Sequence, residues 1–277
     1  MINSRHEKPS KGNPYQLTIK QHVFPKRMIE RFCNPTSKLV DVIRKKEPCR
    51  LSLAPQAEIF CAMRQWDQRA ETLIGESIEN KFNDLVDEII KNPFFTINEE
   101  DNKTINSFYS LVSARQDCKY KPHNDVKSGS KQKIGEYLDK DLQERLESQY
   151  TYFYRDTGLP SRMFNGLMIQ KSIARFQILY ENLKWHIAYL SYGEIVVPEM
   201  IDFFFIPITP NIFLTPQKGS NILRWTDCLA LNYCINILCQ RSTYFFSRNL
   251  NTCFGFNLSN PWAFHPYHLP ISKPLKA

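Results

Sequence analysis

A histidine surrounded by basic residues is the part of the sequence best suited to chemistry. His22 follows Lys20 and precedes Pro25, Lys26 and Arg27. Because proline is tolerated in the first turn of a helix, Pro25 predicts a helix start, where unpaired N–H groups favour anions. In a catalytic role, His22 would move a proton near neutral pH beside a bound phosphate. The alternative is a hydrogen-bonded histidine that closes the N-terminal segment, and the tendency of buried polar groups to find partners favours it.

Two carboxylates form a second candidate site. Glu76 and Glu79 stand at positions i and i+3 of a predicted helix, so they share one face. Such a pair can bind a metal or perform acid–base chemistry, but a solvated charged face explains it more simply. His123, Asn124 and Asp125 resemble an HNH nuclease motif without the flanking strand or Asp-His doublet that this motif needs. No metal site is predicted. No cofactor is expected, since the sequence has no P-loop, GxGxxG or GxSxG motif.

The charge of the chain suits an acidic partner, and the alternative is a basic protein that has no such partner. The formal net charge is +8 and the pI is near 9.0, which suits DNA or RNA. Residues 116–135 are rich in lysine, glycine and serine and are expected to form a mobile basic loop, on which Tyr120 could stack against a base. The alternative is a solvated linker. The predicted phosphate contacts are Lys20, Lys26, Arg27, Arg115, Lys119, Lys121, Lys127, Lys131 and Lys133.

The hydrophobic pattern predicts the elements that must position these residues. Alternation over residues 39–53 indicates a β-hairpin, whereas apolar residues at helical spacing predict a helical region over 55–92, with a break near Gly75. A further helix is predicted over 99–115. Later in the chain, short strands interrupted by prolines are expected over 185–214, and a helix over 225–241.

These elements predict an α+β fold. We expect a mainly helical single domain over residues 16–256, with a small antiparallel or mixed sheet formed where the two strand regions meet. Residues 1–15 are polar and are expected to be a disordered N-terminal arm. Residues 257–277 are rich in proline and aromatic residues and are expected to be a tail that wraps the surface.

The sequence predicts a cytoplasmic protein that does not cross a membrane. It contains no run of about 18 apolar residues and no apolar signal core near its start. Its eight cysteines are scattered and form no CxxC pair, so free thiols are expected rather than a zinc ribbon.

Several short motifs resemble those of a bacterial family, domain of unknown function 4238. Gln21-His22-Val23-Phe24-Pro25 is similar to the family's Gln-His-x-x-Pro opening. Phe108–Arg115 resembles its apolar helix ending in arginine, and Leu231-Asn232 its last helix, which makes Asn232 a candidate site residue. Where family members carry a Ser-Asp-Asn-Pro-like turn, this sequence has Val196-Val197-Pro198-Glu199. Any role of the family's aspartate in that turn therefore has no counterpart here. The resemblance implies a fold more than a function.

Two functions fit these features. The first is a nucleic-acid-acting protein, in its most specific form a nuclease-like effector or toxin in bacterial antiviral defence. The second is a non-enzymatic module, a regulator or inhibitor, that binds a protein partner through its aromatic C-terminal region. The sequence leaves open whether the protein is an enzyme. Binding to nucleic acid that weakens steeply with salt would distinguish the first function from the second.

Overall fold

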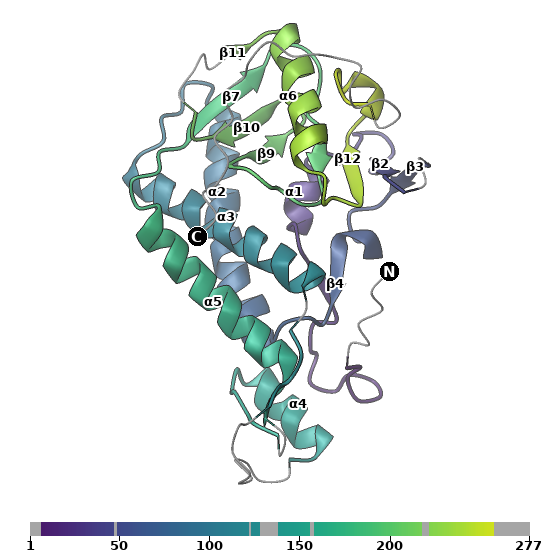
Figure 1. The fold of residues 1–277 in the computed structure, drawn as a ribbon, viewed down its shortest axis with the longest axis vertical. Helices are drawn as coiled ribbons and strands as arrows, with labels where there is room; N and C mark the ends of the chain where they lie inside the picture. Colours follow the sequence, from purple (N-terminus) through teal and green to yellow (C-terminus); the bar gives the residue numbers. More distant parts are fainter. Residues whose placement is uncertain are drawn as a thin grey trace. The chain divides into compact units, whose positions relative to one another are not determined.

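Helices and strands are mixed along the chain, which confirms the predicted α+β class (Figure 1). The computed structural model describes residues 7–46, 49–121, 123–127, 138–155, 158–217 and 222–257. The finer prediction of a mainly helical domain is not well supported, because the described residues form two four-stranded sheets besides the helices.

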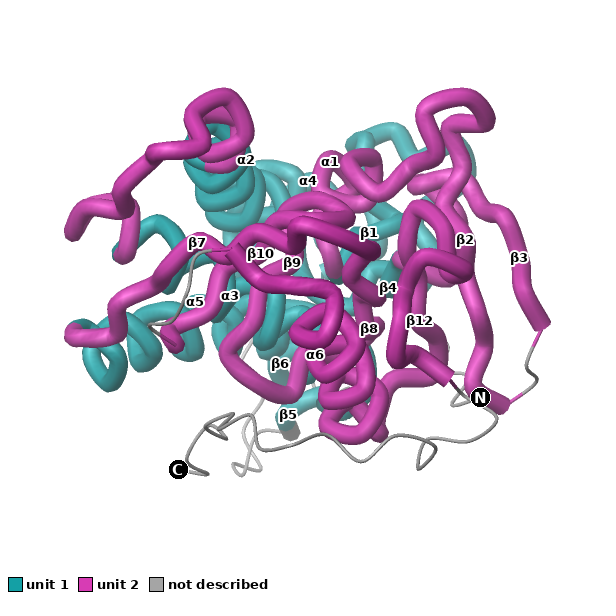
Figure 2. The backbone as a smooth tube through the Cα atoms, turned by 90° about the horizontal axis from the view of Figure 1, so that it is seen from above, with its two compact units in different colours: residues 1–23, 61–85, 103–181 teal, residues 24–60, 86–102, 182–277 magenta. Residues whose placement is uncertain are grey.

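The chain forms two compact units, shown in different colours in Figure 2. Each unit is assembled from separate stretches, so both depend on contacts between residues far apart in sequence. The prediction of one domain over 16–256 stays a prediction. Unit 1 consists of Met1–Val23, Cys61–Leu85 and Lys103–Glu181, and unit 2 of Phe24–Phe60, Val86–Asn102 and Asn182–Ala277.

Unit 1 is mostly helical. Its long helices are α2 (Glu76–Lys91), α3 (Glu99–Tyr120) and α5 (Ser161–Leu179), although the end of α2 and the start of α3 belong to unit 2. The rings of Phe82 and Phe108 stack in its core, with centroids 3.7 Å apart. Its smaller elements are β1 (Lys20–His22), β4 (Cys61–Met63), the π-helix η2 (Arg69–Gly75), β5 (Val126–Lys127), α4 (Lys140–Ser148) and β6 (Gly158–Leu159).

The helical region predicted over 55–92 is wrong in its first part. Residues 58–60 form a 3₁₀ turn (η1, Glu58–Phe60), and β4 then pairs antiparallel with β1, with His22 opposite Cys61. Helical structure begins only at Arg69. Apolar residues at helical spacing before that point contribute to a strand instead, because long-range pairing overrides local propensity.

Helix α3 was predicted correctly at its start but not at its end. Asn98 caps it, since its Oδ1 accepts from the N–H groups of Glu100 (2.8 Å) and Asp101 (3.0 Å), while Asp101 accepts from the Asn98 N–H at 2.9 Å. The helix continues beyond Arg115 to Tyr120. The first part of the predicted basic loop is therefore helical, and most of the rest lies outside the described residues.

Unit 2 contains the two larger sheets. The hairpin of β2 (Val40–Arg44) and β3 (Arg50–Leu53) is antiparallel, as predicted, and β12 (Tyr244–Ser247) pairs with β2. Strand β8 (Val197–Pro198) completes this antiparallel sheet in the order β3-β2-β12-β8. In β12, Phe246 packs edge-to-face against Phe24, Phe32 and Phe60. The remaining small elements are α1 (Lys26–Glu30) and the 3₁₀ turn η3 (Leu250–Thr252).

The second sheet is mixed and carries the other late strands. Helix α6 (Trp225–Leu238) lies against it (Figure 1). The two predicted strand regions therefore do not form one sheet: of the strands within residues 185–214, only β8 belongs to the sheet of the hairpin, which it joins by pairing with β12. The order is β11-β7-β10-β9, formed by β7 (His186–Leu190), β9 (Ile206–Thr209), β10 (Ile212–Thr215) and β11 (Ile222–Leu223), with β11 parallel to β7.

Candidate functional site

The guanidinium of Arg115 is the centre of a polar cluster in unit 1. Arg115 lies on α3 and is 1% exposed. Its Nη1 donates to the carbonyl oxygen of His22 at 3.2 Å and to Glu79, and its Nη2 lies 3.2 Å from Glu71 Oε2. The opening motif, the π-helix η2 and helix α2 therefore meet at one buried cation.

Gln21, in the opening motif, positions Trp66 beside the Arg115 guanidinium. Gln21 is 1% exposed; its Nε2 donates to the carbonyl of Trp66 at 2.9 Å, and its Oε1 accepts from the N–H groups of Gln65 and Trp66. The Trp66 indole donates to Glu71 at 2.6 Å, and the guanidinium carbon of Arg115 lies 5.4 Å from the centroid of the Trp66 ring. The side chain of Gln21 is thus fully used in holding Trp66.

The absence of a side chain at Gly75 leaves room for the guanidinium of Arg115. A Cβ at this position would lie 2.3 Å from Arg115 Nη2 and 2.9 Å from the Ala70 carbonyl oxygen. The glycine stands where the π-helix η2 changes to the α-helix α2. Wide helical turns of this kind are rare and often occur at functional positions. Here the turn brings Glu71 and Arg115 together.

The charges of the cluster compensate one another. Burial disfavours the charged form of Arg115, but Glu79 and Glu71 outweigh this effect and raise the pKa of the guanidinium. Burial raises the pKa of Glu71, and Arg115 and the Trp66 N–H oppose that shift. In the described part of the chain, no group of three or more His, Cys, Asp or Glu side chains could hold a metal. The cluster can orient its two carboxylates, and its geometry is that of a structural ion-pair network.

The candidate acid–base residues are placed separately. His22 is half-buried in β1, whereas α1 begins only at Lys26, so the imidazole does not stand in the first turn of that helix. Glu79 joins the Arg115 cluster, while Glu76, the first residue of α2, is exposed. Glu79 was predicted as a site residue from its i, i+3 spacing to Glu76. In the structure its position depends on Arg115 instead.

Asn232 is a buried residue of unit 2 whose side chain bonds to the backbone of other segments. It is 0% exposed on α6, and its Oδ1 accepts from the Val196 N–H at 2.9 Å. Its Nδ2 donates to the carbonyl oxygens of Glu194 (2.8 Å) and Phe254 (3.0 Å). These bonds tie three segments of unit 2 together.

Many of the predicted phosphate contacts are engaged elsewhere. Lys26 lies 3.5 Å from Glu30 and Arg27 lies 2.6 Å from Asp87. Arg115 is buried, which removes it from any surface that a phosphate could reach. Lys20 is exposed, Lys119 lies over the ring of Tyr120, Lys121 is 4.0 Å from Asp117, Lys127 lies in β5, and Lys131 and Lys133 fall outside the described residues.

Sequence reasoning missed a group of basic residues on the β2–β3 hairpin, which we call the hairpin cluster. It consists of Lys38, Arg44, Lys45, Lys46 and Arg50, and none of them pairs with a carboxylate in the described part of the chain. Lys45 donates to the carbonyl and side-chain oxygens of Gln240 at 2.7 and 2.8 Å, and Arg50 donates to Asn251. The run Arg44-Lys45-Lys46 was the available signal.

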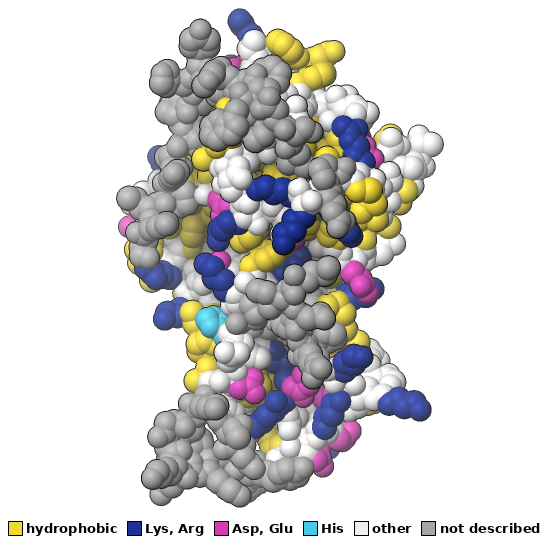
Figure 3. Space-filling model, turned by 45° about the vertical axis from the view of Figure 1, so that its right-hand side comes forward, with side chains coloured by type: hydrophobic (Ala, Val, Ile, Leu, Met, Phe, Trp, Pro, Cys, Tyr) yellow, Lys and Arg dark blue, Asp and Glu magenta, His cyan; other side chains and the backbone are white. Residues whose placement is uncertain are grey.

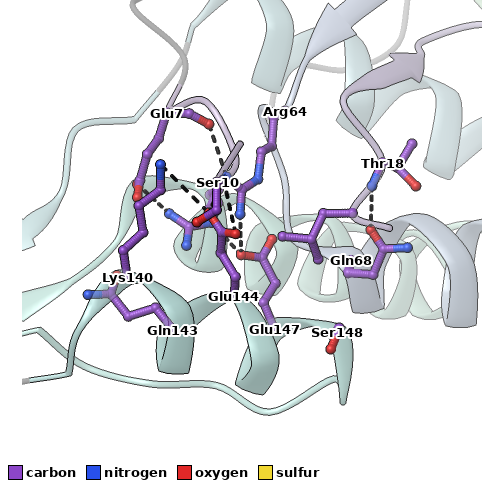
Figure 4. A network of polar contacts seen from close by, with 12 residues as sticks. Glu7, Ser10, Thr18, Arg64, Gln68, Lys140, Gln143, Glu144, Glu147 and Ser148 are labelled. Atoms are coloured by element: carbon purple, nitrogen blue, oxygen red, sulfur yellow. Dashed lines mark hydrogen bonds and ion pairs between the residues drawn. The ribbon is translucent and has the colours of Figure 1, made fainter. Parts of the chain in front are cut away.

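A second buried network in unit 1 involves the predicted disordered arm (Figure 4). Glu147 of α4 accepts from Arg64 and Arg162, each at 2.8 Å, and Glu7 accepts from Arg162 at 2.7 Å. The Ser10 N–H donates to Glu144 at 2.9 Å. Glu7 and Ser10 of the predicted arm therefore have defined partners in a charge cluster that the sequence pattern does not reveal.

Asp67, close to this network, is an isolated buried acid. It is 1% exposed; its Oδ1 accepts from the Ala70 N–H at 2.8 Å, and its Oδ2 has no hydrogen-bond partner in the described part of the chain. Burial, with a contribution from Glu147, raises the pKa of Asp67 to about 7. A Cβ on Gly166 would lie 2.0 Å from that Oδ2, so only glycine leaves room for the carboxyl group.

The cysteines are free thiols, as expected. Burial raises the pKa of Cys118 to about 12 and that of Cys228 to about 11. Cys49, immediately before β3, is exposed.

No protein-family model, curated protein or solved structure matches this chain. The resemblance to domain of unknown function 4238 stays a prediction. Among the described residues, no helix combines the length and apolar character needed to cross a membrane.

Proposed function

We propose that the protein binds nucleic acid and that the hairpin cluster supplies its phosphate contacts. The observation that carries this proposal is the local charge of the hairpin. Residues 38–50 include five basic residues and two acidic ones, Asp41 and Glu47, a local charge of +3. Phosphate contacts from lysine and arginine supply most of the affinity of non-specific nucleic-acid binding.

The shape of the hairpin suits the same role. Ile43 and Arg50 are paired residues on adjacent strands, and Arg44 and Lys46 follow at the end of the hairpin. A two-stranded ribbon can enter the major groove, or its side chains can follow a backbone. The bonds of Lys45 to Gln240 and of Arg50 to Asn251 hold two of the cations in place before a ligand arrives.

Figure 3 shows lysine and arginine side chains beside hydrophobic ones on the face that it presents, with aspartate and glutamate side chains among them. Single-stranded nucleic acid needs cations for its backbone and apolar contacts for its bases.

The experiment is a salt titration of binding to a fluorescent single-stranded oligonucleotide and to its duplex. The double variant Arg44→Ala, Lys46→Ala removes two contacts, so the slope of log K against log salt should fall by about 1.4 for the single strand and about 1.8 for the duplex. The matched control is Lys81→Ala, Lys91→Ala, which removes two exposed lysines of α2. Equal slopes for the hairpin variant and the wild type, or no binding at about 50 mM salt, would refute the proposal.

The catalytic form of the proposal is a nuclease-like effector in bacterial or phage conflict, with His22 moving the proton. The variant His22→Ala should then lose turnover and keep oligonucleotide affinity, with circular dichroism confirming that it is folded. Unchanged turnover in this variant, or no turnover in the wild type, would leave binding as the function.

A protein-interaction module is the second candidate, and one surface feature favours it. Tyr192, Ile222 and Trp225 of unit 2 are 60%, 64% and 47% exposed, and the ring of Phe254 stacks on Tyr192 with centroids 5.5 Å apart. Exposed aromatic groups of this kind are enriched at interfaces. The aromatic tail on which the prediction depended lies outside the described residues. Partner binding through this surface should be insensitive to salt.

A further inference from the structure

A cavity in unit 2 has the size of a small-molecule site. Its volume is about 380 Å³, and it lies between the segment that joins α2 to α3 and strand β7 with the residues before it. Sites for small ligands typically have volumes of about 300–1,000 Å³ and combine apolar walls with few polar groups. No function considered so far uses this cavity.

Its walls are aromatic. Trp185, which is 2% exposed, and Phe94 both line it. Phe94 is 91% exposed, so its ring makes almost no contribution to the folded core and is available to a ligand. A planar aromatic group is the natural partner of such a ring, since every nucleobase offers a face for stacking.

Its charged groups favour an anion. Lys184 is exposed, and it and His186 line the cavity, whereas no carboxylate does so among the described residues. The Trp185 N–H donates to Asn102 Oδ1 at 2.8 Å, which fixes the chain next to Lys184. A phosphate within reach of Lys184 would meet no opposing acidic group of the lining.

We propose that this cavity binds one nucleotide, with the base against Phe94 and the phosphate on Lys184. The choice of ligand rests on the proposed nucleic-acid binding. The same chemistry can come from a free nucleotide or from an unstacked nucleotide within a single strand.

Calorimetric titration of the full-length protein with uridine 5′-monophosphate tests the site, with ribose 5-phosphate as the ligand that lacks the base. The nucleotide should bind and ribose 5-phosphate should bind at least about ten-fold more weakly. The variant Phe94→Ala should weaken nucleotide binding by about five-fold or more, and Lys184→Ala, which removes the phosphate contact, by about three- to ten-fold. The control Lys91→Ala, an exposed lysine outside the cavity, should bind as the wild type does.

No nucleotide binding at millimolar concentration, equal binding of ribose 5-phosphate, or full affinity in both cavity variants would overturn the inference. Oligonucleotide binding separates the two proposals. If Phe94→Ala weakens both ligands, the strand is the source of the nucleotide. If the nucleotide binds and oligonucleotides do not, the cavity site stands and the proposed function fails. If oligonucleotides bind with a hairpin-dependent salt slope and the nucleotide does not, the function stands and the cavity inference fails.

Discussion

Replacing Arg115 by methionine should destabilise the protein more than any surface substitution. Methionine fills much of the same volume beside Trp66 but carries no charge and no donor. The variant Arg115→Met would leave Glu71 and Glu79 without their cation and the His22 carbonyl oxygen without its donor.

The expected loss follows from the burial of each partner. Removing one member of a buried ion pair typically costs about 3–5 kcal/mol, because the other charge stays uncompensated. Arg115 is 1% exposed, but the side chains of Glu71 and Glu79 are 16% and 21% exposed, so water screens part of their charge. We therefore expect the free energy of unfolding to fall by about 3 kcal/mol, the lower end of that range. The melting temperature should fall by roughly 6–10 °C.

Urea denaturation followed by circular dichroism measures this loss, with Lys81→Met on α2 as the matched control that removes an exposed cation. The control should change stability by less than about 0.5 kcal/mol. Adding Glu79→Gln to Arg115→Met removes one uncompensated charge and should recover about 1 kcal/mol. If Arg115→Met unfolds at the same urea concentration as Lys81→Met, the cluster does not stabilise the fold and the reasoning is wrong.

Three further changes test other positions. Gly75→Ala should lower the melting temperature although alanine is the better helix former by about 1 kcal/mol, because its Cβ would lie 2.3 Å from Arg115 Nη2; a stabilised variant would contradict this. Asp67→Asn removes a carboxyl group whose pKa is about 7 in the folded chain and near 4 when unfolded, so the wild type binds more protons when folded and loses stability as pH rises between these values. The stability of Asp67→Asn relative to the wild type should therefore increase by roughly 2 kcal/mol from pH 5 to pH 8 in urea titrations, and a constant difference would refute the assignment. Phe82→Ala should cost about 3–5 kcal/mol, because it removes a fully buried ring that stacks on Phe108 and leaves a cavity, and a thermal melt unchanged from the wild type would count against that packing.

Local signals explain what could be predicted from the sequence. The β2–β3 hairpin shows the alternation of a half-buried strand pair, and α3 begins at a capping asparagine followed by acidic residues. Both features depend on neighbours within a few residues, which a pattern can detect. The helix predicted before Arg69 fails because β4 forms only by pairing with β1.

The candidate site depended on contacts that no local pattern encodes. Gln21 and Trp66 are 45 residues apart, and Arg115 and Glu71 are 44 apart, so their meeting is a property of the fold. Charge counting has the same limit, because Arg27 is neutralised by Asp87, 60 residues further along the chain. The sequence shows which residues are charged, and the structure shows which charges remain available to a partner.

The position of Cys49 provides a chemical handle on the hairpin. Its thiol is exposed next to Arg50, whereas burial raises the pKa of Cys118, Cys228, Cys239 and Cys253 and keeps those thiols protonated and slow to react. A brief treatment with a maleimide dye would therefore label this side chain first. Dye emission would then report directly on whatever approaches the hairpin, without any engineered cysteine.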